Sequence, residues 1–208
     1  MAKWISPAGA VAMLSHDPAG GSEDFGFSTL QLHGKQQQRR SVSDLVRAKL
    51  QPREPTAAEA DAESLPVTAY DHRLVLAPLV ADTSDIEQLY AAYDAQVQDR
   101  LTTLAIVLTM KFGRDELVHD MMSAAIVFVE MVLARKRRLT SLVVLHMPSD
   151  GMSPRPPHIH VVCTSRVHRP AGFAELHPAF EDSLAEIHAE FRDEWRGFKS
   201  CWDKLPGK

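Results

Sequence analysis

The feature that most constrains the fold is a pair of apolar runs, at 142–146 and 158–164, on either side of a loop rich in proline, glycine and serine. Two such runs joined by a turn-forming segment predict an antiparallel β-hairpin. Alternate residues of a strand point to the same face of its sheet, so His158 and His160 share a face. His146, at the end of the first run, can join them across the hairpin. The sequence therefore predicts three imidazoles on one sheet face.

Three imidazoles that leave coordination positions open for water or substrate are typical of a metal site. A divalent ion held by neutral ligands can polarise a phosphate or carbonyl oxygen. We predict Mg²⁺ or Mn²⁺, with Zn²⁺ as a further option, at His146, His158 and His160. The alternative for an H-x-H pair is a polar sheet face, and the adjacent His146 is what favours the metal. The other histidines that we considered are expected to be solvated or packed: His119, His168, His177 and His188.

Composition is that of an ordinary globular protein, with 208 residues, 45% hydrophobic and 24% charged. The net charge of -4 gives no overall attraction to nucleic acid, so DNA binding would require a local basic patch.

Cys163 and Cys201 are expected to be reduced thiols. The longest apolar stretch, 121–134, contains Glu130 and is too short to cross a bilayer. With no signal peptide in view, we expect a soluble cytoplasmic protein without a membrane span.

The first 66 residues are predicted to be a poorly ordered arm, because glycine, proline and polar residues dominate them. Within the arm, 25–34 could form a strand and 41–50 a short helix with a serine cap. Residues 67–208 are predicted to form the folded domain.

In that domain the patterns predict a strand over 67–79, a helix over 83–101 and a long helix over 113–138. Residues 101–112 fit either a strand or a helix. A final helix is expected over 180–202. Together with the hairpin, this order favours an α+β fold, an antiparallel sheet with helices packed on one face.

The layout of His146, an intervening loop and the run PHIHVV at 157–162 resembles the HUH endonucleases, in their relaxase or mobilisation branch. The resemblance spans about residues 68–198, and only the three-histidine element is specific. It implies an HUH-like sandwich and a metal-dependent endonuclease that nicks and transfers single-stranded DNA in plasmid mobilisation, conjugation or replication initiation. Relaxosome proteins would be its partners.

An HUH enzyme also needs a tyrosine that attacks the scissile phosphate and forms a covalent 5′-phosphotyrosine. This chain has no tyrosine after Tyr93, so the candidates are Tyr70, Tyr90 and Tyr93, of which we take the helical pair Tyr90 and Tyr93 as catalytic. The alternative is that both helical tyrosines pack in the core. In that case the chain would be a degenerate member that binds DNA without cutting it, as an accessory protein of a mobile element.

Basic residues near the hairpin are candidates for binding DNA phosphates. They are Arg135, Lys136, Arg137 and Arg138 before the first strand, Arg155 in the loop and Arg166 after the second strand. The alternative for the first four is a solvated helix end. Asp150, in the loop, is a candidate carboxylate partner for the metal or the histidines.

A rival interpretation comes from the run RPPHIH at 155–160, which resembles a segment of the intradiol ring-cleaving dioxygenases. In those enzymes two histidines and two tyrosines bind ferric iron, so the ligands here would include two of the three tyrosines. A visible spectrum would reveal the coloured ferric tyrosinate. Helices on both sides of the motif argue against the largely β fold of that family.

Overall fold

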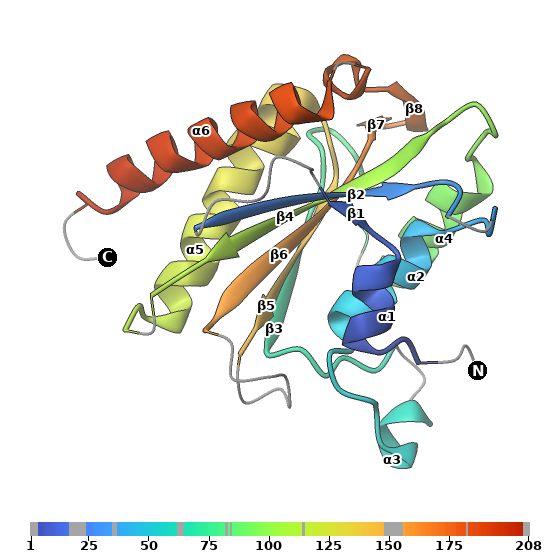
Figure 1. The fold of residues 1–208 in the computed structure, drawn as a ribbon, viewed down its shortest axis with the longest axis horizontal. Helices are drawn as coiled ribbons and strands as arrows, with labels where there is room; N and C mark the ends of the chain where they lie inside the picture. Colours follow the sequence, from blue (N-terminus) through green and yellow to red (C-terminus); the bar gives the residue numbers. More distant parts are fainter. Residues whose placement is uncertain are drawn as a thin grey trace.

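The structure is a computed structural model. It describes residues 4–16, 24–34, 37–61, 65–81, 83, 85–113, 115–147, 156–181 and 183–205. A six-stranded sheet forms its centre (Figure 1). Every pair of neighbouring strands is antiparallel. In spatial order the strands are β1 (Ser15–His16), β2 (Phe25–Gln31), β4 (Thr103–Lys111), β6 (His158–Thr164), β5 (Ser141–His146) and β3 (Asp71–Val75). β5 and β6 form the predicted hairpin.

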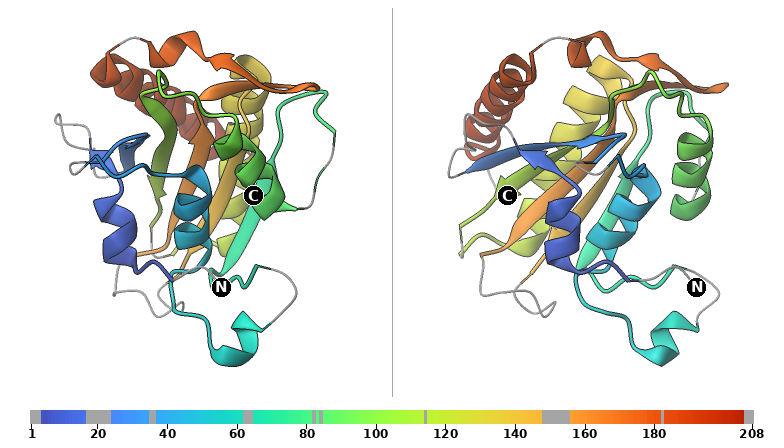
Figure 2. Two further views of the ribbon diagram at one scale, coloured as in Figure 1. Left: turned by 90° about the vertical axis from the view of Figure 1, so that its right-hand side faces the viewer. Right: turned by 45° about the vertical axis from the view of Figure 1, so that its right-hand side comes forward.

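Helices cover both faces of the sheet (Figures 1 and 2). One face carries α5 (Val118–Phe128), which continues as the π-helical segment η1 (Val129–Arg135), and α6 (Leu184–Trp202). The other face carries α2 (Val42–Leu50) and α4 (Ile86–Ala95), with α1 (Pro7–Ala12) beside α2. The remaining elements are α3 (Ala57–Ala60), the short hairpin β7 (Arg166–Arg169) and β8 (Gly172–Leu176), and the 3-10 turn η3 (Pro178–Phe180).

Two apolar clusters, one on each face, explain why the sequence of β4 was ambiguous. Ile106 and Leu108 lie in the cluster under α5 and α6, whereas Ala105 and Val107 lie in the cluster under α2 and α4. A strand that is buried on both sides carries a continuous apolar run instead of an alternating one. Periodicity therefore could not distinguish this strand from a buried helix.

The α+β fold with an antiparallel sheet and packed helices is confirmed, with two differences from the sequence-based expectation. Helices lie on both faces of the sheet and not on one. The described part of residues 1–66 is also not a loose arm, because β2 pairs along its length with β4 and α2 is buried against the sheet. Phe25 and Phe27 on one face, with Leu30 on the other, give this polar segment enough apolar contacts to order it.

The N-terminus of α2 is held by a side chain from α4. The Asp94 carboxylate accepts hydrogen bonds from the backbone N–H of Val42 at 2.8 Å and of Ser43 at 2.9 Å, and from the Ser43 hydroxyl at 2.6 Å. A negative charge here satisfies N–H groups that the helix leaves unpaired and complements the helix dipole.

We therefore expect Asp94→Ala to lower the free energy of unfolding by about 2 kcal/mol. Chemical denaturation would measure the loss. The matched control is Asp99→Ala, which removes an exposed carboxylate whose ion pair with Arg39 is at the surface and should change stability by less than about 0.5 kcal/mol. Equal effects of the two substitutions would contradict the capping role.

None of the helices in the described ranges is long and apolar enough to cross a membrane.

Candidate metal centre

The three histidines come together at one end of the sheet, on the face that α2 covers. His146 is the Cα partner of His158, and Val144 is the partner of His160. Directly opposed residues in an antiparallel pair share a face, so this register places all three imidazoles together. Their ring centroids lie 4.9 to 5.4 Å apart, and one ligand atom from each lies within 4.8 Å of the others. The sequence prediction of three imidazoles on one face is confirmed.

His146 is fixed by the end of α2. Its Nε2 lies 2.7 Å from the carbonyl oxygen of Lys49. A carbonyl can only accept, so Nε2 carries the proton and Nδ1 presents a lone pair. That Nδ1 is buried and has no hydrogen-bond partner among the described residues. Burial lowers the pKa of His146 to about 4, against the opposing effect of the Lys49 hydrogen bond, so the ring is neutral, as a ligand must be.

Hydrogen bonds orient the other two imidazoles as well. Nδ1 of His158 lies 3.0 Å from the carbonyl oxygen of Pro156 and therefore donates to it. Nδ1 of His160 lies 3.0 Å from the Thr109 hydroxyl on the neighbouring strand. The carbonyl fixes the tautomer of His158, whereas the Thr109 hydroxyl can donate or accept and therefore fixes only the orientation of the His160 ring. In metal-binding histidines such partners direct the other nitrogen toward the ion. The donor set, an orphaned buried nitrogen beside two oriented imidazoles, fits a divalent metal ion.

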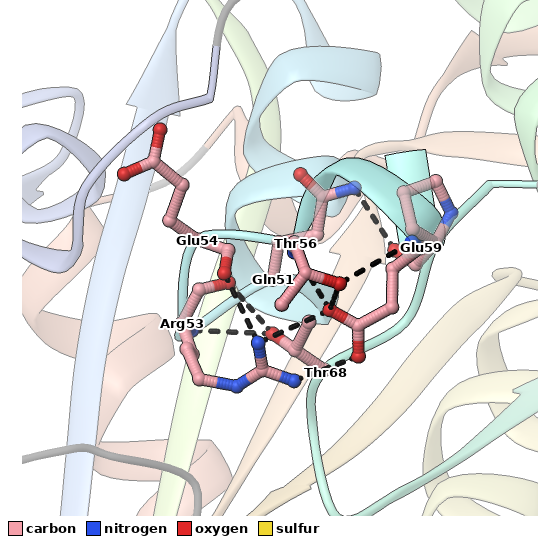
Figure 3. Close-up of polar contacts among 7 residues, drawn as sticks. Gln51, Arg53, Glu54, Thr56, Glu59 and Thr68 are labelled. Atoms are coloured by element: carbon pink, nitrogen blue, oxygen red, sulfur yellow. Dashed lines mark hydrogen bonds and ion pairs between the residues drawn. The ribbon is translucent and has the colours of Figure 1, made fainter. Parts of the chain in front are cut away.

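The segment after α2 forms a turn that includes α3, and hydrogen bonds link its described residues (Figure 3). Arg53 makes two contacts with the Glu59 carboxylate, at 2.9 and 3.1 Å, and Thr56 and Glu59 form a capping box. The Arg53 hydrogen bonds and the Thr56 backbone N–H lower the pKa of Glu59 to about 2. Thr68 closes the turn, since its hydroxyl donates to the Arg53 carbonyl at 2.8 Å and accepts from the Arg53 N–H.

This turn brings Tyr70 to the end of the sheet that carries the histidines. The Leu50 carbonyl, next to the Lys49 carbonyl that holds His146, accepts from the N–H groups of Thr68 and Ala69 at 2.9 and 3.0 Å. Tyr70 follows at once and precedes Asp71, whose partner on β5 is Leu145. Its side chain is 54% exposed.

The two predicted catalytic tyrosines lie elsewhere. Tyr93 donates a 2.6 Å hydrogen bond to the carbonyl of Leu104, and its hydroxyl lies 3.2 Å from Ser165, beyond the end of β6 opposite to His158. Tyr90 is fully buried, and its hydroxyl has no partner in the part of the chain that the structure describes. Burial raises the pKa of both phenols well above the ordinary value. Neither hydroxyl is placed to attack a phosphate at the histidines, because both pack in the core.

Five of the six predicted DNA-binding residues lie at the end of the sheet opposite to the histidines, and one of them, Arg166, follows Thr164, the last residue of β6. Arg135, Lys136, Arg137 and Arg138 precede Ser141, the first residue of β5, which is roughly 17 Å from His146 along the strand. Proximity in the sequence was misleading because the full length of β5 separates the two groups.

Two of the predicted arginines have structural partners. Arg137 is buried and forms ion pairs with Glu190 and Glu194 of α6, and it lies over the ring of Phe191. Lys136 contacts the same two glutamates. Arg166 donates to the carbonyls of Gln96, Phe173 and Ala174. Arg155 and Asp150 lie outside the described residues.

The four other histidines considered in the sequence are packed or solvated side chains, as expected. His168 lies in β7, not in a loop, stacks on Phe173 and hydrogen-bonds Thr140 at 2.8 Å; burial lowers its pKa to about 4. His188 is buried on Phe27, His177 caps η3, and His119 is exposed on α5.

Basic residues that the sequence analysis missed lie beside the histidines. Lys49 and Lys111 line a cavity together with Thr109, His158 and His160. Lys111 is the Cα partner of His158 on the adjacent strand. Assigning 101–112 to a strand would have revealed Thr109 and Lys111 by their spacing of two; nothing in the sequence indicated Lys49.

The sequence matches no family model and no curated protein. The fold is similar to that of a solved structure from a study of the molecular basis of vancomycin resistance transfer in Staphylococcus aureus, with a TM-score of 0.52 and 17% sequence identity. The similarity covers 67% of this chain and 72% of the other. At this identity the likeness shows a shared fold.

Proposed function

We propose that this protein binds a divalent metal ion through His146, His158 and His160 and cleaves and rejoins single-stranded DNA in the manner of a relaxase. The observation that carries the proposal is the convergence of three imidazoles, each of which is oriented by a hydrogen bond to a neighbouring group. A fold shared with a protein from the study of resistance transfer, and the sequence resemblance to relaxases, agree with it.

The residues around the site prepare it for phosphate chemistry. When bound, a divalent ion would supply Lewis acidity to the oxygens of a phosphate. The Lys49 carbonyl, the Pro156 carbonyl and the Thr109 hydroxyl hold the three rings in position before any ligand arrives. Preorganised groups of this kind lower the cost of rearrangement during the reaction. Lys111, beside His158, adds positive charge for the DNA backbone.

Tyr70 is the tyrosine best placed to act as the nucleophile. It is exposed, and its neighbours Thr68 and Ala69 are tied to the end of α2 that holds His146. In the proposed step the Tyr70 oxygen forms a bond to phosphorus and the bond between phosphorus and the 3′ oxygen breaks. The phenol proton passes to solvent, and the 3′ oxygen leaves as a hydroxyl after taking up a proton.

A second candidate function is DNA binding without cleavage. The burial of Tyr90 and Tyr93 favours it, since it removes two of the three tyrosines from consideration as nucleophiles. The intradiol dioxygenase interpretation has less support, because the same burial leaves Tyr70 as the one exposed phenol and that iron site needs two tyrosine ligands.

Cleavage can be tested with random-sequence single-stranded oligonucleotides labelled at the 5′ or the 3′ end, in the presence of Mg²⁺ or Mn²⁺. A relaxase-type reaction should leave the 3′-labelled fragment attached to the protein and release the 5′-labelled fragment with a free 3′ hydroxyl. Denaturing gels would separate the adduct from free DNA. Binding of the oligonucleotides without any adduct would reject cleavage and support the second candidate.

A further inference from the structure

A cavity of about 420 Å³ opens directly beside two of the three imidazoles. This volume is in the range of small-molecule binding sites, about 300 to 1,000 Å³. Its two walls differ in chemistry, because one comes from the sheet and the other from the N-terminal helix α1.

The sheet provides a wall that is polar and basic except for Val107 of β4. Thr109 is the Cα partner of His160, and Lys111 is the partner of His158, so all four side chains share one sheet face. Ser28 of β2 and Lys49 of α2 border the same space. Two lysines within reach of the same imidazoles suit a phosphate better than a neutral ligand.

The opposite wall is apolar and comes from Val11 and Leu14, in and just after α1. Val11 is 48% exposed, so a ligand in the cavity can contact its side chain. The wall is anchored to the rest of the protein, since the Ala12 carbonyl accepts from Arg40 at 3.3 Å and the Trp4 indole donates to the Gln51 carbonyl at 3.0 Å.

We propose that this cavity receives one nucleotide of a single-stranded DNA, with its phosphate toward Lys111 and the histidines and its base against Val11 and Leu14. This inference rests on the proposed function, whose substrate it describes at the level of one nucleotide. A base that enters the cavity must be unpaired and unstacked, so the cavity selects single strands over duplexes. Apolar contact with the flat face of a base makes no hydrogen bond to the base edge, so it is tolerant of sequence.

The test compares thymidine 5′-monophosphate with 2-deoxyribose 5-phosphate, which has the same phosphate and sugar but no base. Calorimetry would give the two Kd values, with and without Mn²⁺. We expect the nucleotide to bind about tenfold more tightly, because its base buries apolar surface against Val11 and Leu14. Val11→Ser should remove most of this difference and leave the Kd of the sugar phosphate unchanged. Lys111→Gln should weaken both ligands by a similar factor.

The matched controls are Leu117→Ser, at an exposed apolar residue before α5, and Lys204→Gln, at an exposed residue just after α6. Both should leave the Kd values unchanged. Oligothymidylate should displace the bound nucleotide if the cavity serves a DNA strand. Failure to displace it would mean that the cavity binds free nucleotides, and would overturn the inference.

The same measurements separate this inference from the proposed function. Equal affinity for the two ligands, whether or not Mn²⁺ is present, would show that the cavity holds no base. Electron paramagnetic resonance would measure binding of Mn²⁺. Absence of Mn²⁺ binding would count against the metal site. The effect of Val11→Ser on the two Kd values does not depend on the metal ion. It therefore tests binding of a base in the cavity whether or not the protein binds Mn²⁺.

Discussion

Replacing His158 and His160 together by alanine is expected to abolish binding of Mn²⁺ and all cleavage of single-stranded DNA. The substitution removes two of three candidate ligands, and one imidazole alone gives no chelation. Calorimetric titration with Mn²⁺ and the oligonucleotide assay would measure the two losses. Because His158 and His160 lie at a strand end and line a cavity, the double variant should still fold, which circular dichroism would verify.

The control for this variant is His119→Ala, at an exposed histidine of α5 on the opposite face of the sheet. It should bind Mn²⁺ as the unsubstituted protein does. If the double variant kept both metal binding and cleavage, the three-histidine site would be refuted. Loss of cleavage with retained metal binding would move the ligands elsewhere and leave the histidines with a role in holding DNA.

Tyr70→Phe is expected to eliminate the covalent protein–DNA adduct while DNA binding stays within about twofold of its original affinity. The substitution removes the phenol oxygen that would bond to phosphorus but keeps the ring. Denaturing gels with 3′-labelled oligonucleotides would detect the adduct, and filter binding would measure affinity.

Tyr90→Phe is the matched control, because the Tyr90 hydroxyl is buried without a partner among the residues described. Removing such a hydroxyl should cost little stability and leave the adduct intact. An adduct that survived Tyr70→Phe but disappeared in Tyr90→Phe would restore the helical tyrosine as nucleophile, and would require α4 to move during the reaction.

The sequence predicted the hairpin and the shared face of its histidines because both depend on local rules. A spacing of two sets the face within a strand, and His146 and His158 end up paired because they flank one loop. The fold class could be predicted for the same reason, since most helices and strands have their own apolar pattern.

The features that the sequence did not reveal depend on contacts between distant segments. The first 66 residues look polar and rich in glycine, but β2 needs only a few apolar side chains once β4 pairs with it. The basic residues 135–138 were assigned to the site because they are close to His146 in the chain, yet a strand separates them. The position of Tyr70 near the histidines depends on hydrogen bonds from the N–H groups of residues 68 and 69 to the Leu50 carbonyl. No local sequence pattern predicts these hydrogen bonds.

The hydrogen bond between His146 and Lys49 means that the histidine hairpin is not a portable motif. The Lys49 carbonyl, which lies 97 residues earlier in the chain, determines which nitrogen of His146 carries the proton. Residues 141–164 grafted onto another sheet would keep the three rings but lose this control, and His146 could then carry its proton on either nitrogen. A designer who wished to transfer the site would have to move the end of α2 with it.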